Sequence, residues 1–119
     1  MATILLVDDE SDIRESIRDM LEADGHRVVE ATDGQEALQG WRAHQPDLLI
    51  TDFWMPRMNG LDVIESVAAE QPALPIILMS GGMEDHLRRS VLQHFPSVRY
   101  LPKPFANSQL REYVRDASQ

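Results

Sequence analysis

Residues 47–60 of this 119-residue chain read DLLITDFWMPRMNG. Residues 48–51 are apolar or β-branched, which is typical of a buried strand, and Asp52 ends the run. A carboxylate at the end of a buried strand costs free energy unless a partner compensates it. The partner can be a hydrogen-bond donor from a neighbouring loop, or a cation beside a carboxylate that is placed for chemistry. The rest of the chain decides between these two possibilities.

Composition limits the class of protein. With 119 residues, 43% hydrophobic and 26% charged, the chain is expected to form one domain over residues 1–119. It has no cysteine, which excludes disulfides and thiolate metal sites. The net charge of −9 argues against direct binding to nucleic acid, which needs clustered Lys and Arg. No apolar run is long enough to span a membrane, and MATILLVDDE has no secretory signal, so we expect a cytoplasmic location.

Strand-like and helix-like segments alternate along the chain. Continuous apolar runs predict central strands, buried on both faces, at residues 4–7, 48–51 and 76–79. Weaker runs predict edge strands at residues 28–31 and 98–101. Helical spacing follows each run, so the βα unit is repeated five times. This predicts an α/β fold of the flavodoxin-like kind, a doubly wound (βα)5 three-layer sandwich with a parallel sheet of order 2-1-3-4-5.

Polar residues with the ability to cap a helix stand near four of the predicted helix starts. We expect Ser11 or Asp12 to cap the first helix and Asn107 or Ser108 to cap the last. Asp33 with Glu36 is expected to open the second helix, and Asn59-Gly60 the third. Pro56 is expected to turn the loop after Asp52 away from the strand.

In such a sheet the carboxyl ends of all strands lie on one edge, and ligands bind where the strand order reverses. Asp8, Asp9 and Asp52 follow the two strands that flank this point, Ser80 ends the fourth strand, and Lys103, the only Lys of the chain, follows the fifth. Three carboxylates repel one another and need a cation, and their hard oxygen atoms favour Mg²⁺ or Ca²⁺. A carboxylate, a divalent cation, an ammonium and a hydroxyl together indicate phosphoryl transfer.

Taken one at a time, these residues have plainer interpretations. Asp9 can cap a helix, Ser80 can sit in a turn, and Lys103 can be a solvated surface group. Asp52 fits the role of a cap poorly, because the next helix starts near Asn59, seven residues later. Their joint position at strand ends on one edge favours a functional site.

The segments ILLVDDE, LLITDFWMPRMNGLDV, IILMSG and YLPKPF resemble, in order and spacing, the receiver domain of two-component response regulators, in the CheY-like superfamily. The resemblance covers essentially the whole chain. It implies that Asp52 is the phosphoacceptor, which attacks the phosphoryl group on a histidine of a sensor histidine kinase or a histidine phosphotransfer protein. It also implies a cis peptide bond between Lys103 and Pro104.

The same resemblance implies a role for each site residue. A Mg²⁺ (or Mn²⁺) site would be made of Asp8, Asp9, Asp52 and the backbone carbonyl of Trp54. Lys103 and Ser80 would bind the phosphoryl oxygens.

The resemblance further implies a switch. Ser80 and Tyr100 would be the switch residues, and Tyr100 would report phosphorylation to the face made by the fourth helix, fifth strand and fifth helix. That face would take an output domain or form a homodimer. Trp54 and Gly82 would modulate hydrolysis, and we hypothesise that Trp54 shields the acyl phosphate. Where the family often has Gly-Ala before the fifth strand, this chain has Phe95-Pro96-Ser97.

Two alternatives belong to other functional classes. A Mg²⁺-dependent aspartyl-phosphate phosphatase of the haloacid dehalogenase kind needs a second Asp two positions after the nucleophile, where this chain has Trp54. A degenerate receiver that serves only as a docking module would lack some of the key residues, all of which are present. We therefore expect a signalling switch that catalyses its own phosphorylation and dephosphorylation, and not a conventional enzyme.

Overall fold

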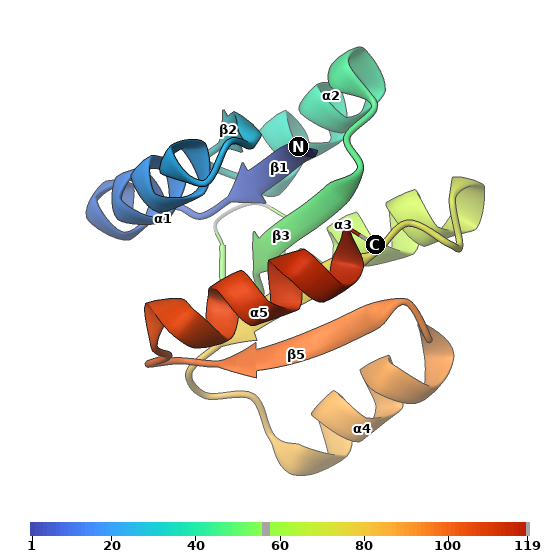
Figure 1. Cartoon of the computed structure of the whole chain (residues 1–119). Coiled ribbons are helices and arrows are strands. Elements are labelled where there is room, and N and C mark those ends of the chain that lie inside the picture. The colour runs from blue at the N-terminus through green and yellow to red at the C-terminus, as the bar shows by residue number, and fades with distance from the viewer. Residues whose placement is uncertain (56–57, 119) are drawn as a thin grey trace.

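The computed structural model describes residues 1–55 and 58–118, so Pro56, expected to turn the loop, lies outside the described residues. Strands and helices alternate along this part of the chain (Figure 1). The elements are β1 (Thr3–Val7), α1 (Ser11–Ala23), β2 (Arg27–Ala31), α2 (Gly34–His44), β3 (Leu48–Asp52), α3 (Gly60–Glu70), β4 (Ile76–Ser80), α4 (Asp85–His94), β5 (Val98–Pro102) and α5 (Asn107–Ala117).

The strands form one parallel sheet of order β2-β1-β3-β4-β5, as the sequence predicted. Every residue of β3 and β4 is buried, whereas β2 and β5 carry exposed residues and form the edges. The order reverses between β1 and β3, where Val7 pairs with Thr51. Asp52 therefore ends its strand at the reversal point.

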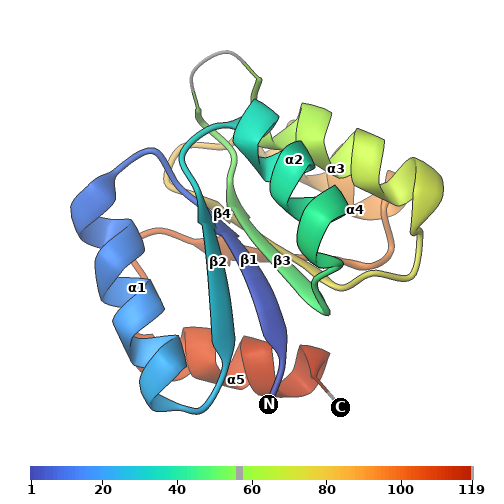
Figure 2. The same cartoon turned by 90° about the horizontal axis from the view of Figure 1, so that it is seen from above.

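Helices cover both faces of the sheet. Figure 2 shows α1 and α5 on one side and α2, α3 and α4 on the other. Because side chains of a strand alternate, Leu5 and Val7 pack under α2 and α3, and Ile4 and Leu6 pack under α1 and α5. Each such side chain contributes about 1.5–3 kcal/mol when it is fully buried. The two cores fix the sheet and with it the position of the strand ends.

Two of the expected helix starts are confirmed, and a side chain caps each of them. Asp33 Oδ1 accepts a hydrogen bond from the Glu36 N–H at the start of α2, over 2.8 Å. Asn59 Oδ1 accepts one from the Asp62 N–H at the start of α3, over 3.0 Å. Both caps satisfy backbone donors that a helix leaves free at its first turn.

The caps expected for the first and last helices were wrong. Helix α1 begins at Ser11, so Glu10 is its N-cap residue. The helix starts this early because Asp8 Oδ1 accepts a hydrogen bond from the Glu10 N–H over 2.9 Å and turns the chain at that point.

Helix α5 likewise begins at Asn107, and neither Asn107 nor Ser108 caps it. Ala106 takes the N-cap position, and its N–H is accepted by Gln109 Oε1 over 3.1 Å. No helix in the described part of the chain has the length and apolarity required to cross a bilayer.

Candidate functional site

Asp52 lies at the carboxyl end of β3 and is 5% exposed. The Nζ of Lys103, which follows β5, lies 3.1 Å from Asp52 Oδ2 and 3.4 Å from Asp8 Oδ2. Asp8 follows β1 and is fully buried. The fold thus brings Asp8, Asp52 and Lys103 into one cluster, as predicted, and the Lys103–Pro104 peptide bond is cis.

The cluster shifts the pKa values of its members. Burial raises the pKa of the Asp52 carboxyl, and this effect outweighs the opposing attraction of Lys103. Burial also disfavours the charge on Lys103, but the carboxylates of Asp52 and Asp8 outweigh it together and raise the pKa of Lys103. The ammonium is therefore charged at neutral pH. One ammonium does not fully stabilise the Asp52 carboxylate, so the ionised form calls for further positive charge.

Ser80 ends β4 and is fully buried. Its Oγ accepts a hydrogen bond from the Gly82 N–H over 3.4 Å. Its backbone carbonyl accepts two more, from the Lys103 N–H over 2.9 Å and from the Tyr100 hydroxyl over 3.0 Å. One residue thus connects the Asp52 cluster to Tyr100.

The acidic group differs in one member from the expected set. One carboxylate oxygen from each of Asp8, Glu10 and Asp52 lies within 4.8 Å of the other two. Asp9 and Glu10 are both exposed, but Asp9 does not join this group, so its role as a metal ligand stays a prediction. Glu10 was missed, although a signal existed. Side chains alternate along an extended backbone, which Glu10 adopts, so residues two apart share a side.

These donors fit a hard divalent cation. Carboxylate oxygens are the ligands that Mg²⁺ prefers, and Mg²⁺ is usually held by one or two carboxylates with the remaining positions left to water and phosphate oxygens. The cluster also contains more negative than positive charge. The residues present therefore fit the ion that the sequence predicted.

Trp54 and Gly82 lie beside the site and are exposed. The Trp54 side chain is 56% exposed and meets the Phe53 ring edge to face, with 4.6 Å between ring centroids. A Cβ added at Gly82 would meet no atom within 4 Å. Whether these two positions control water access, and whether the Trp54 carbonyl binds a metal, stays a prediction.

Two glycines let neighbouring helices close on the loop that follows Asp52. A Cβ at Gly60 would collide with the carbonyl oxygen of Asp52 and lie 2.9 Å from Phe53 Cα. A Cβ at Gly34 would lie 2.6 Å from Met58 Cβ. The Gly60 N–H also donates to the Phe53 carbonyl over 2.8 Å. The start of α3 is therefore seated against the backbone that carries Asp52.

Tyr100 is half-buried on the face made by α4, β5 and α5. The Arg88 guanidinium of α4 lies 5.5 Å from the centre of its ring. Arg99 lies 3.7 Å from the centre of the Tyr113 ring and forms an ion pair of 3.0 Å with Asp116. This face therefore carries stacked cations and aromatic rings.

A groove of about 470 Å³ lies next to the cluster, between α1 and the start of α5. Its lining is mainly apolar and includes Ile13, Ile17, Pro104 and Phe105, together with Lys103. The groove thus offers an apolar surface beside the Asp52 site.

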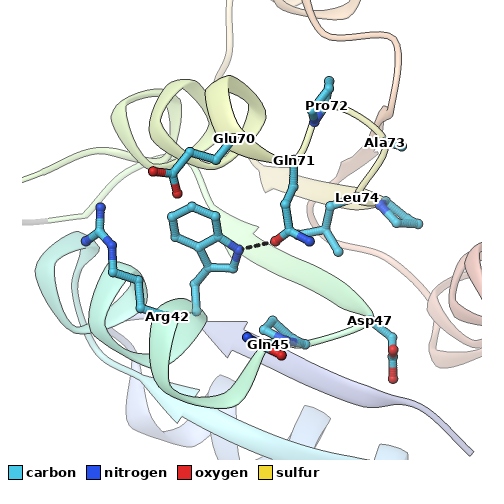
Figure 3. Close-up of a pocket in the computed structure, with 11 residues that line it drawn as sticks. Arg42, Gln45, Asp47, Glu70, Gln71, Pro72, Ala73 and Leu74 are labelled. Carbon is cyan, nitrogen blue, oxygen red and sulfur yellow. Dashed lines mark hydrogen bonds between the residues drawn. The ribbon is translucent and has the colours of Figure 1, made fainter.

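A second pocket, of about 920 Å³, lies at the amino ends of β3 and β4, opposite the strand ends that carry Asp52 (Figure 3). It is lined by residues that precede β3 and β4, such as Asp47 and Pro75, together with the ends of α2 and α3. Within it the Trp41 Nε1–H donates to Gln71 Oε1, and this contact ties α2 to α3. The pocket is therefore separate from the strand ends that carry Asp52.

The model of the response regulator receiver domain family matches residues 4–115. The transcriptional regulatory protein PdtaR of Mycobacterium tuberculosis is 36% identical over 108 residues, 90% of this chain and 52% of PdtaR. The response regulator MprA of Mycobacterium leprae is 37% identical over 117 residues, 94% of this chain and 49% of MprA. The chain thus spans about half the length of these curated relatives.

Solved structures share the fold. A response regulator receiver domain protein from Clostridium thermocellum has a TM-score of 0.86 and 30% identity, with 98% of this chain and 94% of that chain covered. The chemotaxis response regulator CheY4 of Vibrio cholerae has a TM-score of 0.88 and 27% identity, with 98% of each chain covered.

Proposed function

This chain belongs to the response regulator receiver domain family, and we propose that it is a phosphorylation-dependent switch in which Asp52 accepts a phosphoryl group from a phosphohistidine. One observation carries the proposal. The Lys103 ammonium bridges Asp8 and Asp52, at 3.4 and 3.1 Å, where the strand order reverses. This arrangement supports phosphoryl transfer, because positioning and charge neutralisation do most of the catalytic work in such reactions.

The proposed step is an attack by the Asp52 carboxylate oxygen on phosphorus, with cleavage of the bond between phosphorus and the donor histidine nitrogen. Lys103 binds a phosphoryl oxygen and the Ser80 hydroxyl donates a hydrogen bond to another. Asp8, Asp9, Asp52 and the Trp54 carbonyl would hold Mg²⁺ (or Mn²⁺), which when bound neutralises charge on the phosphoryl oxygens. The chain promotes its own phosphorylation and dephosphorylation, without turnover of a conventional substrate.

The output of the switch is a change in population. A phosphoryl group on Asp52 adds negative charge and draws the Ser80 hydroxyl toward it, which biases an existing equilibrium between two conformations. The Ser80 carbonyl holds the Tyr100 hydroxyl, so this shift reaches the face of α4, β5 and α5. We place the contact with an output domain or a second copy there. The net charge of −9 supports a protein partner over nucleic acid.

The groove between α1 and α5 supports the choice of donor. Its apolar lining beside Lys103 suits an amphipathic helix, which buries apolar side chains in such grooves. We infer that the protein that carries the phosphohistidine docks in this groove through such a helix. A cytoplasmic location, which this partnership requires, stays a prediction.

The experiment is labelling with acetyl phosphate in the presence of Mg²⁺, followed by mass spectrometry of the intact chain. One phosphoryl group is expected on the wild type and none on Asp52→Asn or in EDTA. Labelling that survives Asp52→Asn overturns the assignment. Steady turnover of a phosphate monoester would point to a phosphatase, and a wild type that never labels would point to a docking module.

A further inference from the structure

Glu10 brings a third carboxylate to the Asp52 cluster. Its carboxylate oxygen lies within 4.8 Å of one oxygen each from Asp8 and Asp52. Glu10 is the N-cap residue of α1, yet its side chain makes no capping hydrogen bond to that helix. The side chain is thus directed to the cluster and not to the free N–H groups of the first turn.

The backbone holds Glu10 in this position. The Glu10 N–H donates to Asp8 Oδ1 over 2.9 Å, and the Glu10 carbonyl accepts the Arg14 N–H over 3.0 Å. Both contacts involve the main chain of Glu10, so they leave its carboxylate available. Neither contact uses the Glu10 side chain, so Glu10→Gln keeps the groups that make both.

The nearby guanidinium of Arg14 is committed elsewhere. Its Nη1 donates to the Asp8 carbonyl over 2.9 Å, and its Nε pairs with Glu30 over 3.0 Å. Across residues 1–55 and 58–118, no ion pair to the Glu10 carboxylate is found. Within this part of the chain, Glu10 therefore meets two carboxylates and has no cation of its own.

The charges do not balance. Asp8, Glu10 and Asp52 bring three carboxylates, and Lys103 brings one ammonium. Like charges this close repel each other unless a cation lies among them. When all three carboxylates are ionised, two negative charges remain, which is the charge that one divalent cation neutralises.

We propose that Glu10 is a ligand of the divalent cation at the Asp52 site, directly or through a bound water molecule. The inference rests on the proposed function, since it concerns the cation that phosphoryl transfer to Asp52 uses. It adds Glu10 to the residues expected from the family resemblance. Asp9 and Glu10 are both exposed, and of these two only Glu10 lies in the carboxylate group. Glu10 then helps to set how tightly this chain holds Mg²⁺.

The test is a titration of the chain with Mg²⁺ alone, without a phosphodonor. Binding is followed by tryptophan fluorescence, because Trp54 is exposed two residues after Asp52, and by the rise in thermal midpoint that a bound ligand causes. Glu10→Gln removes the charge, keeps the size, and is expected to weaken Mg²⁺ binding about tenfold, in the range seen when residues around a metal are changed.

The matched control is Glu15→Gln. It removes the same charge from an exposed position on the same helix, outside the carboxylate group, and is expected to bind Mg²⁺ as the wild type does. The thermal midpoint in EDTA checks folding, and for Glu10→Gln it is expected to stay equal or rise, because one repulsive charge is gone. A Glu10→Gln affinity equal to that of Glu15→Gln overturns the proposal.

The failure of this inference is separable from failure of the proposed function. If acetyl phosphate labels the wild type at Asp52 while Glu10→Gln binds Mg²⁺ normally, only the role of Glu10 is overturned. If the wild type binds no Mg²⁺ and never labels, both fall. If Glu10→Gln loses Mg²⁺ affinity and Glu15→Gln does not, Glu10 is a ligand. This conclusion does not depend on whether an Asp9→Asn variant also loses Mg²⁺ affinity.

Discussion

The hydroxyl of Tyr100 donates a hydrogen bond to the backbone carbonyl of Ser80 over 3.0 Å. The same carbonyl accepts the Lys103 N–H over 2.9 Å. Ser80 is therefore held on one side by the residue that binds Asp52 and on the other by the aromatic ring of the α4–β5–α5 face. Any displacement of Ser80 toward a phosphoryl group must change one or both of these bonds.

Tyr100→Phe is expected to uncouple the two ends of this connection. The variant keeps the ring and loses the hydroxyl, so unfolding in urea should cost about 0.5–1.5 kcal/mol less. Labelling of Asp52 by acetyl phosphate should stay as in the wild type, because Tyr100 does not contact the cluster. The change in hydrogen exchange that phosphorylation causes in α4 should shrink. An undiminished change in α4 would rule out this connection.

Asp52→Asn is expected to stabilise the chain in EDTA at neutral pH. Burial raises the pKa of Asp52 above its ordinary value of 3.8, so the folded state binds this proton more tightly than the unfolded state. The contribution of protonated Asp52 to the free energy of unfolding is present below pH 3.8. It is lost as the pH rises through the pKa of Asp52 in the folded state. At pH 7 the amide removes that penalty and should raise the thermal midpoint.

The same comparison at acidic pH is the control for Asp52→Asn. Below pH 3.8 the wild-type carboxyl is protonated in both states, so the advantage of the amide should vanish. A gain that is equal at both pH values would mean that the charge of Asp52 is not its source. Added Mg²⁺ should reduce the gain at pH 7, because it stabilises the wild type alone.

Gly60→Ala is expected to destabilise the chain by about 1–3 kcal/mol, as inserted methyl groups do in tightly packed regions. The new methyl group would collide with the Asp52 carbonyl, so α3 or the end of β3 must move. Labelling of Asp52 should slow in the same variant. Urea unfolding measures the first effect, with Gly82→Ala as the control, since a methyl group there meets open space. Equal stability of the two variants would contradict this packing.

Trp54→Ala is expected to shorten the lifetime of the phosphorylated chain severalfold. The indole follows Asp52 by two residues and is 56% exposed. The prediction rests on our hypothesis that it limits the approach of water to the acyl phosphate. Loss of label after removal of acetyl phosphate measures the rate. Trp54→Phe, which keeps an aromatic ring, should stay near the wild type. An unchanged rate in Trp54→Ala would end the idea of a shield.

The sequence predicted the sheet and its order because burial on both faces leaves continuous apolar runs in β1, β3 and β4. The convergence of Asp8, Asp52, Ser80 and Lys103 followed from topology alone. The strand order and this convergence depend on many residues at once, so a wrong prediction for one residue or one turn does not change them.

Features that depend on one turn of the backbone were not predictable in the same way. The cap of α1 was misplaced because Asp8 takes the Glu10 N–H, and the same turn brings Glu10 to the cluster in place of Asp9. Helix α3 packs closely against the backbone of Asp52 at Gly60. This contact depends on interatomic distances that no sequence pattern contains.

Lys103 is the only lysine of the chain, and its side chain is 19% exposed between two carboxylates. Reagents that acylate amines therefore have one side-chain target here, besides the amino terminus. The raised pKa of Lys103 keeps this amine protonated and slow to react. A metal ion or a phosphoryl group bound at Asp52 would change the reactivity of the Lys103 amine. The rate at which Lys103 is acylated would therefore report whether the Asp52 site is occupied.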